Sequence, residues 1–365
     1  MRMTVTYRVR ADAASIEARA AAIAVEQSVE MPLAAISDEG VLRDIAGEVQ
    51  GISELAPGEF EVRIGLAAET TGFEAGQLLN MLFGNTSLQE DVTLLDAEIP
   101  EAMAAYFGGP NFGIAGLRAK CGAGARALTC TALKPQGLPA SELAALAGKL
   151  AAGGIDVIKD DHGLADQAYS PFGTRVRACA EAVRRAGSHT HYAPNISGSF
   201  ECAADQIALA MEEGIEAVLA EPMIIGVSNF HRLVEAFPEM AFIAHPAMAG
   251  ASRIAPPFLL GKLFRLFGAD VTIYPNYGGR FSYSPETCKA IADAARQPWH
   301  GLSACMPCPA GGMALSRVPE LLDFYGPDTM LLIGGSLLSA KDRLTEETAA
   351  FQARVAAAFE GTGHG

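Results

Sequence analysis

Apolar and polar residues alternate along two short stretches in the first third of the chain, 3–10 and 59–66. Alternation with a period of two is typical of strands that bury one face. Helical spacing over 11–24 and 73–82 follows these stretches. The pattern predicts an α+β region of the ferredoxin-like kind over residues 1–120, in which helices cover one face of a small antiparallel sheet.

Beyond about residue 125, short apolar runs alternate with amphipathic stretches, several of which begin with Ser and end near Gly, as helices do. Eight such units in about 240 residues favour a (β/α)₈ barrel over residues 121–365, with a doubly wound open sheet as the alternative. The chain is therefore expected to be α/β, with the barrel as its carboxyl-terminal domain. The predicted barrel strands are 127–133, 155–160, 189–195, 216–222, 241–247, 271–276, 300–306 and 329–335.

Polar residues at the carboxyl ends of these strands are the first candidates for chemistry, because barrel enzymes place their catalytic groups there. They are Lys134, Lys159, Asp160, Asp161, His162, Asn195, Glu221, His245 and Asn276. The densest cluster is Lys159-Asp160-Asp161-His162, whose carboxylate oxygens are ligands that suit Mg²⁺. A lysine can join such a site only as a carbamate, formed by CO₂ on a neutral amine. The alternative is that these charges only solvate a loop.

Two glycine pairs, Gly311-Gly312 and Gly334-Gly335, follow the last two predicted strands. Barrels often bind phosphate there through backbone N–H groups, although ordinary turns would also use glycine. Lys134 beside a metal could transfer a proton, or it could be a surface lysine. His245 is either a substrate hydrogen-bonding group or a core residue.

Composition excludes several classes of protein. A formal charge of −15, a single Trp and the lack of a basic run argue against nucleic-acid binding. No apolar run reaches the roughly 20 residues of a membrane span. Seven cysteines at scattered spacings indicate reduced thiols and a cytoplasmic location. Cys305 and Cys308 lack a second pair that would complete a zinc site, so we expect them in the core.

Several motifs, in order, resemble the large chain of the RuBisCO superfamily over about residues 20–340. GGIDVIKDDH resembles the family's metal loop, and CTALKPQGL resembles its first barrel-strand motif. MLFGNTS and GPNFGIAGLR are similar to two elements of the amino-terminal part. FIAHPAMAG, MPCPAGGMALSRVPEL and LLIGGSL are similar to the fifth-strand histidine motif and the phosphate loops.

The resemblance implies an amino-terminal α+β domain, a carboxyl-terminal barrel, and a homodimer in which each amino-terminal domain completes the partner's site. It implies one Mg²⁺ per site, held by carbamylated Lys159 with Asp161, and with His162 in the place of a third ligand that is normally Glu. Lys134 would be the proton-handling lysine, and Lys159 and His245 are the other catalytic residues that the resemblance implies. The implied substrate- and phosphate-binding residues are Glu26, Asn85, His245, Asn276, Arg280, Gly311, Gly312, Gly334 and Gly335.

Departures from the family pattern remove the groups that a carboxylase needs. Gln136, Pro246, Ala249 and Ala310 replace a lysine, an arginine, a histidine and a serine, and the loop 274–281 carries no lysine. Arg280 could replace part of that charge, but Arg is not an equivalent proton donor. These losses affect the second phosphate site and the stabilisation of added CO₂. The chain therefore resembles a RuBisCO-like protein that does not fix CO₂.

The remaining chemistry is enolisation of a phosphorylated ketose followed by proton transfer. Resemblance to the short branch of RuBisCO-like proteins implies an isomerase that converts 5-methylthioribulose 1-phosphate to 1-methylthioxylulose 5-phosphate, in the salvage of methylthioadenosine and methionine. Alternatives are a 2,3-diketo-5-methylthiopentyl-1-phosphate enolase, and a lyase acting as 3-oxo-isoapionate-4-phosphate decarboxylase, transcarboxylase or hydrolase. A sugar-phosphate-binding protein without activity is the non-enzyme alternative.

Overall fold

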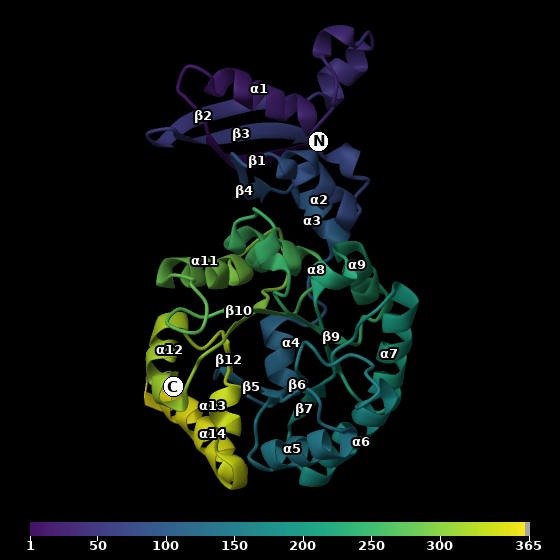
Figure 1. Ribbon diagram of the computed structural model, residues 1–365, viewed down its shortest axis with the longest axis vertical. Coiled ribbons are helices and arrows are strands. Elements are labelled where there is room, and N and C mark those ends of the chain that lie inside the picture. Colours follow the sequence, from purple (N-terminus) through teal and green to yellow (C-terminus); the bar gives the residue numbers. More distant parts are fainter. Residues whose placement is uncertain (362–365) are drawn as a thin grey trace.

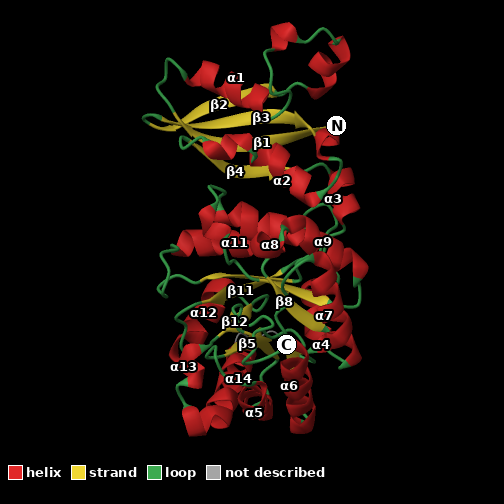
Figure 2. Cartoon of the chain, turned by 45° about the vertical axis from the view of Figure 1, so that its right-hand side comes forward, coloured by secondary structure: helices red, strands yellow, loops and turns green. Residues whose placement is uncertain are grey.

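The chain folds into two parts, a small sheet region followed by a larger barrel (Figure 1). The structure, a computed structural model, describes residues 1–361. Figures 1 and 2 both show the amino-terminal sheet at one end of an elongated molecule, with β4 as the sheet edge nearest the barrel. Within the described range, no helix is long and apolar enough to span a bilayer.

The amino-terminal sheet has the strand order β2-β3-β1-β4, and β1 pairs antiparallel with both β3 and β4. Along β1 the side chains of Met3, Val5, Tyr7 and Val9 are buried, as the alternation predicted. The Tyr7 hydroxyl donates to the Leu82 carbonyl of α2 at 2.6 Å, which fixes that helix against the sheet. The strands are β1 (Arg2–Arg10), β2 (Glu48–Ala56), β3 (Glu59–Ala67) and β4 (Val92–Glu98).

Two of these strands, β2 and β4, were not predicted from the sequence. The outer strand β2 is largely exposed along its length, so it carries no apolar alternation. Its place is set by pairing with β3, which is a tertiary contact that a local pattern does not reveal.

The carboxyl-terminal part is a parallel barrel, and the mixed α/β architecture that we expected is confirmed. Among the described residues its strands are β5 (Leu128–Leu133), β6 (Val157–Asp160), β7 (His191–Ala193), β8 (Ala217–Ala220), β9 (Ala241–Ala244), β10 (Val271–Pro275), β11 (Met306–Ala310) and β12 (Met330–Leu332). They form two four-stranded ladders, β12-β5-β6-β7 and β11-β10-β9-β8. A parallel bridge between Asn195 and Leu219 joins β7 to β8, and the Thr329 hydroxyl donates to the Pro307 carbonyl between β12 and β11.

The seventh barrel strand is the one strand that the sequence misplaced. We expected it over 300–306, but β11 runs from Met306 to Ala310. His300 and Gly301 both have positive φ and form a turn instead. The prediction ended the strand at residue 306 because prolines, here at 307 and 309, argue against a central strand. Met306 N–H and the Ala310 carbonyl bond toward β10, so the two proline nitrogens face the other way, toward β12, where no regular ladder is formed.

Helices surround the barrel, and one of them closes its amino-terminal end. In α4, Ile114 and Leu117 pack with the first residues of the barrel strands. The Asp270 carboxylate accepts the backbone N–H groups of Phe112 and Gly113 at the start of α4, at 2.7 and 2.8 Å. These contacts join α4 to the barrel, although the predicted boundary at residue 120 would separate them. The boundary stays a prediction.

The helices are α1 (Ile16–Glu26), α2 (Ala75–Phe83), α3 (Glu101–Phe107), α4 (Gly113–Lys120), α5 (Ala140–Ala152), α6 (Phe172–Ala186), α7 (Phe200–Glu212), α8 (Pro222–Ile225), α9 (Val227–Ala236), α10 (Phe264–Leu266), α11 (Pro285–Arg296), α12 (Val318–Tyr325), α13 (Gly335–Leu338) and α14 (Leu344–Gly361).

Candidate active site

Polar side chains meet at the carboxyl ends of three barrel strands, β5, β6 and β9. Lys134 follows β5, and its Nζ lies 2.8 Å from Asp161 Oδ1, just after β6. His162 follows Asp161 and stacks on His245, which follows β9, with ring centroids 4.2 Å apart and planes within 9° of parallel. The structure thus brings together four residues that the sequence singled out.

Lys159 is almost completely buried at the end of β6. Its Nζ donates to the Asp160 carbonyl at 2.9 Å. Burial lowers the pKa of the Lys159 ammonium, because the charged form loses its hydration, and the positive charge of Lys134 acts in the same direction. A lowered pKa enlarges the fraction of neutral amine, which is the form that reacts with CO₂ to give a carbamate.

Asp161 is the carboxylate that these cations surround. Burial alone would raise its pKa, but hydrogen bonds from His162 and Lys134 outweigh burial and hold the pKa of Asp161 well below its usual range. Asp161 is therefore ionised across the working pH range and can act as a metal ligand.

A buried network under the mouth fixes the loop that carries these groups. The Asp160 carboxylate accepts hydrogen bonds from Arg175 Nε at 3.0 Å and from the Tyr192 hydroxyl at 2.8 Å. Arg175, which is completely buried in α6, also donates to the carbonyls of Ala165 and Ser170 in the loop after β6. Sequence reasoning missed Arg175, because nothing in its local pattern separates it from the exposed arginines of the same helix.

His245 is held in one neutral tautomer. The Ala247 N–H donates to His245 Nδ1 at 3.2 Å, so the ring proton lies on Nε2. Burial lowers the pKa of His245 to about 2, and the nearby charge of Lys159 contributes. At neutral pH this side chain can donate one hydrogen bond to a substrate oxygen without carrying a charge.

Two buried oxygens next to this cluster have no hydrogen-bond partner among the described residues. They are Glu221 Oε1 and Asn195 Oδ1, at the ends of β8 and β7. Burial raises the pKa of Glu221 to about 7, although His162 and Lys159 lower it. The sequence placed both residues at strand ends but gave them no role. Unpartnered buried oxygens are costly unless a cation, a water or a proton satisfies them.

The residues at the barrel mouth fit a divalent cation on the condition that Lys159 is modified to a carbamate. Within residues 1–361 no three His, Cys, Asp or Glu side chains are close enough together to hold a metal by themselves. Asp161, His162 and a modified Lys159 would complete a set, and the unpartnered Glu221 and Asn195 oxygens beside them are acceptors that bound waters can satisfy.

The glycine pairs differ in what surrounds them. Gly311 and Gly312 have φ values of +90° and +82°, which favour glycine, and a Cβ on Gly312 would lie 2.9 Å from Gly279 Cα in the loop after β10. Gly334 and Gly335 border open space, and Gly335 begins α13. The first pair is thus covered by a neighbouring loop, whereas the second is accessible.

Asn276 and Arg280, two predicted substrate contacts that follow β10, differ in burial. Asn276 is completely buried, its Nδ2 donates to the Tyr277 carbonyl, and its Oδ1 accepts from the Tyr325 hydroxyl at 2.6 Å. Both ends of this side chain are hydrogen-bonded inside the protein, and its contact with a substrate stays a prediction. Arg280 is exposed, with its guanidinium 5.6 Å from the ring centre of Phe281.

Glu26 and Asn85 meet in the amino-terminal part, away from the strand-end cluster. Asn85 Nδ2 donates to Glu26 Oε1 and to Glu30 Oε1, both at 3.0 Å. Glu30 was not predicted, because only the fold brings it to Asn85. The helix α1, which ends at Glu26, lies beside β2 and β3, on the part of the sheet far from the barrel (Figures 1 and 2). Within residues 1–361, no hydrogen bond or ion pair joins this trio to the barrel mouth of the same chain.

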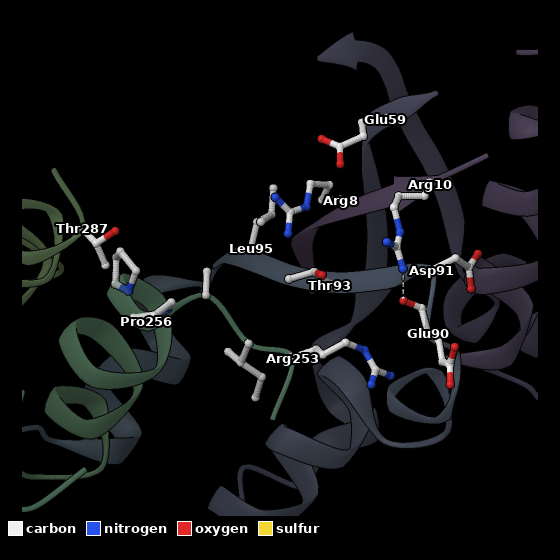
Figure 3. Close-up of a pocket in the computed structure, with 13 residues that line it drawn as sticks. Arg8, Arg10, Glu59, Glu90, Asp91, Thr93, Leu95, Arg253, Pro256 and Thr287 are labelled. Carbon is white, nitrogen blue, oxygen red and sulfur yellow. Dashed lines mark hydrogen bonds between the residues drawn. The ribbon is translucent and has the colours of Figure 1, made fainter. Parts of the chain in front are cut away.

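A groove of about 580 Å³ lies between the amino-terminal sheet and the barrel (Figure 3). Arg10 donates there to the Glu90 carbonyl, and Arg253 donates to the carbonyls of Val92 and Gln89. Arg253 therefore joins the barrel to the amino-terminal part, whereas the Arg10 hydrogen bond lies within the amino-terminal part. None of the strand-end residues lines this groove, so the candidate site is the barrel mouth and not this groove.

Comparison with known proteins agrees with this geometry. Residues 113–362 match the family described as ribulose bisphosphate carboxylase large chain, catalytic domain. The chain is 59% identical to the 5-methylthioribulose-1-phosphate isomerase of Rhodospirillum rubrum over 98% of this chain and 97% of the relative. It is 33% identical to a 2,3-diketo-5-methylthiopentyl-1-phosphate enolase of Geobacillus thermodenitrificans, over 88% and 83%.

Among solved structures, the RuBisCO-like protein of Rhodopseudomonas palustris superposes with a TM-score of 0.91 at 55% identity, over 97% of each chain. The resemblance predicted from the sequence motifs is confirmed: the chain belongs to the RuBisCO large-chain family, and its near relatives are RuBisCO-like proteins.

Proposed function

We propose that this protein is an isomerase that converts 5-methylthioribulose 1-phosphate to 1-methylthioxylulose 5-phosphate. The observation that carries the proposal is the 59% identity, over nearly the whole chain, to the R. rubrum protein of that name. The strand-end cluster supports it, because the cluster combines an ionised carboxylate with two lysines and a neutral histidine.

The reaction moves protons between neighbouring carbons of a ketose, so it needs a base, an acid and a way to stabilise the enolate. A divalent cation, expected to be Mg²⁺, would supply Lewis acidity when bound. Lys159 as a carbamate, Asp161 and His162 would hold it. Lys134, which lies against Asp161, is positioned to give or take a proton, and His245 Nε2–H can orient a substrate oxygen.

A carboxylase reaction is disfavoured by the residues around the same mouth. Pro246 follows His245 where the family pattern has an arginine, and the loop after β10 has Arg280 and no lysine. Gln136 stands where the pattern has a lysine, and its Nε2 lies 3.4 Å from Asp161 Oδ2. A methylthio group needs no cationic partner, so these losses are compatible with a monophosphate that carries an apolar tail.

We further propose that the phosphate binds backbone N–H groups at Gly311, Gly312, Gly334 and Gly335. Positive φ at the first pair and open space at the second are compatible with close approach of an anion. We also propose a cytoplasmic homodimer in which Asn85 and Glu26 of each chain complete the partner's site. The distance of α1 from its own barrel supports the shared site, and seven unpaired cysteines support the location.

The second candidate is the enolase reaction, favoured by the 33% identity to the Geobacillus protein. Proton and phosphorus NMR with each substrate in separate tubes decides between the two. We expect conversion of 5-methylthioribulose 1-phosphate and no change of 2,3-diketo-5-methylthiopentyl 1-phosphate. Turnover of the diketone alone would replace the isomerase proposal by the enolase.

A further inference from the structure

The Asn85 turn, residues 85–88, is held at its start by the amino-terminal part of the chain. It is a short 3₁₀ helix that follows α2. The Thr86 N–H donates to Gln27 Oε1 at 3.1 Å, and Gln27 Nε2 donates to the Met81 carbonyl at 2.8 Å. Gln27 is almost completely buried just after α1. The first residues of the turn are therefore fixed against α1 and α2.

The end of the turn is held from the barrel, by Arg253. Figure 3 shows this side chain extending from the connection after β9 toward the loop that carries Glu90. Its guanidinium donates to the carbonyls of Ser87, of Gln89 at 3.0 Å and of Val92 at 3.2 Å. Within the described residues, no other barrel side chain hydrogen-bonds to the Asn85 turn. The barrel thus reaches this turn through one arginine.

The backbone around Arg253 is itself fixed against the amino-terminal sheet. The Leu94 N–H of β4 donates to the Arg253 carbonyl at 3.0 Å, and the Ala255 N–H donates to the Leu94 carbonyl at 2.8 Å. A parallel bridge between Leu94 and Ile254 results. Arginine presents its donors in a planar fork, which suits several carbonyls at once in a way that a lysine ammonium does not. The anchored backbone and the fork together set where the turn lies.

We propose that Arg253 is a positioning residue that acts in trans, by holding Asn85 of its own chain in place for the active site of the partner subunit. The inference rests on the shared site proposed above and names a residue that this site needs. Arg253 also lies eight residues after His245 in the same connection, so the competing arrangement is an effect in cis on the barrel site of its own chain. The two arrangements give opposite results when subunits are mixed.

Mixed dimers separate an effect in trans from one in cis. The Arg253→Ala homodimer should lose at least tenfold in kcat/KM. After verified exchange with Lys159→Ala subunits, about a quarter of wild-type activity should return, because half of the dimers are mixed and each has one site without a lesion. Exchange with Asn85→Ala subunits is the matched control and should restore nothing, because both lesions then affect the amino-terminal parts and every site receives one.

Three results of the mixing experiment would overturn the inference. The first is an Arg253→Ala homodimer as active as wild type. The second is no recovery with Lys159→Ala although Asn85→Ala with Lys159→Ala does recover, which would place the effect in cis. The third is no recovery of that reference pair, which would reject the shared site as well. Arg253→Lys, which keeps the charge without the fork, is the second variant and should show the same recovery.

Hydrogen exchange followed by mass spectrometry tests the positioning without reference to the reaction. Peptides that cover residues 85–92 should exchange at least tenfold faster in Arg253→Ala than in the wild-type protein. Arg63→Ala, which removes only an exposed ion pair with Glu98, is the control and should leave their exchange unchanged. Unchanged exchange in Arg253→Ala rejects this inference while isomerase turnover by the wild type stands. Faster exchange in a protein that shows no isomerase turnover rejects only the proposed reaction.

Discussion

At the β6 end of the barrel mouth, charged side chains are buried and fixed by partners, whereas beyond β10 and β12 the chain is rich in glycine and more exposed. Lys159 and Asp160 are buried, and Arg175 joins Asp160 to the loop that follows. In contrast, Arg280 projects from an exposed loop, and Gly335 borders open space. Burial shifts pKa values and orders charges for proton transfer, while an open surface can take substrates of different shape. From this comparison we infer that the proposed chemistry belongs to the first region and the choice of substrate to the second.

The largest expected effect comes from the β6 end. Lys159→Ala should lower kcat at least a thousandfold, because loss of a group that holds the catalytic cation removes several kcal/mol of stabilisation of the transition state. Lys149→Ala, an exposed lysine on α5, is the control and should leave kcat unchanged. Activity of Lys159→Ala within tenfold of wild type would place the chemistry elsewhere.

Removing Arg175 should destabilise the protein, because Arg175 bonds to Asp160 beneath the barrel mouth. Arg175→Met leaves the buried Asp160 charge without its main partner, and we expect a loss of about 3 to 5 kcal/mol in the free energy of unfolding. Urea denaturation measures it. Arg177→Met on the same helix removes only an exposed ion pair with Glu213 and should cost less than about 1 kcal/mol. Equal losses in the two variants would mean that the buried pair stabilises the protein no more than the exposed pair does.

Replacing Glu221 should change the free energy of unfolding by an amount that depends on pH. Its folded-state pKa is raised to about 7, above the value in the unfolded chain, so its ionisation destabilises the fold as pH rises from about 4.5 to 7. Glu221→Gln should therefore gain stability relative to wild type, by up to about 3 kcal/mol at pH 8, and little at pH 4.5.

Unfolding curves of both proteins in metal-free buffer at the two pH values measure this gain. Glu212→Gln, an exposed change on α7, should show no such trend. A gain for Glu221→Gln that does not depend on pH would show that its carboxyl ionises normally in the fold.

A smaller effect is expected where the surface is open. Gly335→Asp should raise KM more than tenfold, about 1.4 kcal/mol, because a carboxylate would repel the substrate phosphate. The variant should fold, since a Cβ there contacts nothing. Ser339→Asp places the same charge at the other end of α13 and serves as the control. An unchanged KM in Gly335→Asp moves the phosphate site away from this pair.

A partial recovery of activity on mixing two inactive variants tests whether the mouth is completed by a second chain. Asn85→Ala and Lys159→Ala homodimers should each be nearly inactive. Random mixing should restore about a quarter of wild-type activity, because half of the dimers are mixed and each has one intact site. No recovery after verified exchange of subunits would mean that each site lies within one chain.

Local patterns predicted the barrel well and the site in part. The apolar runs located seven of the barrel strands, and strand ends named Lys134, Lys159, Asp161, His162 and His245, which the structure brings together. The prolines of β11 concealed the remaining strand. Arg175 and Glu30 could not have been found, because their roles depend on contacts across the fold with Asp160 and Asn85. The hydrogen bond from Tyr325 to Asn276 could not have been predicted, because a strand-end amide has the same sequence signal whether it faces a substrate or another side chain.

The most direct test of the central claim follows two substrates with one preparation of the metal-loaded wild-type protein and labelled bicarbonate. We predict that 5-methylthioribulose 1-phosphate is converted to 1-methylthioxylulose 5-phosphate, seen by NMR, and that ribulose 1,5-bisphosphate incorporates no label. Incorporation of label into phosphoglycerate, with the methylthio substrate unchanged, would contradict the account.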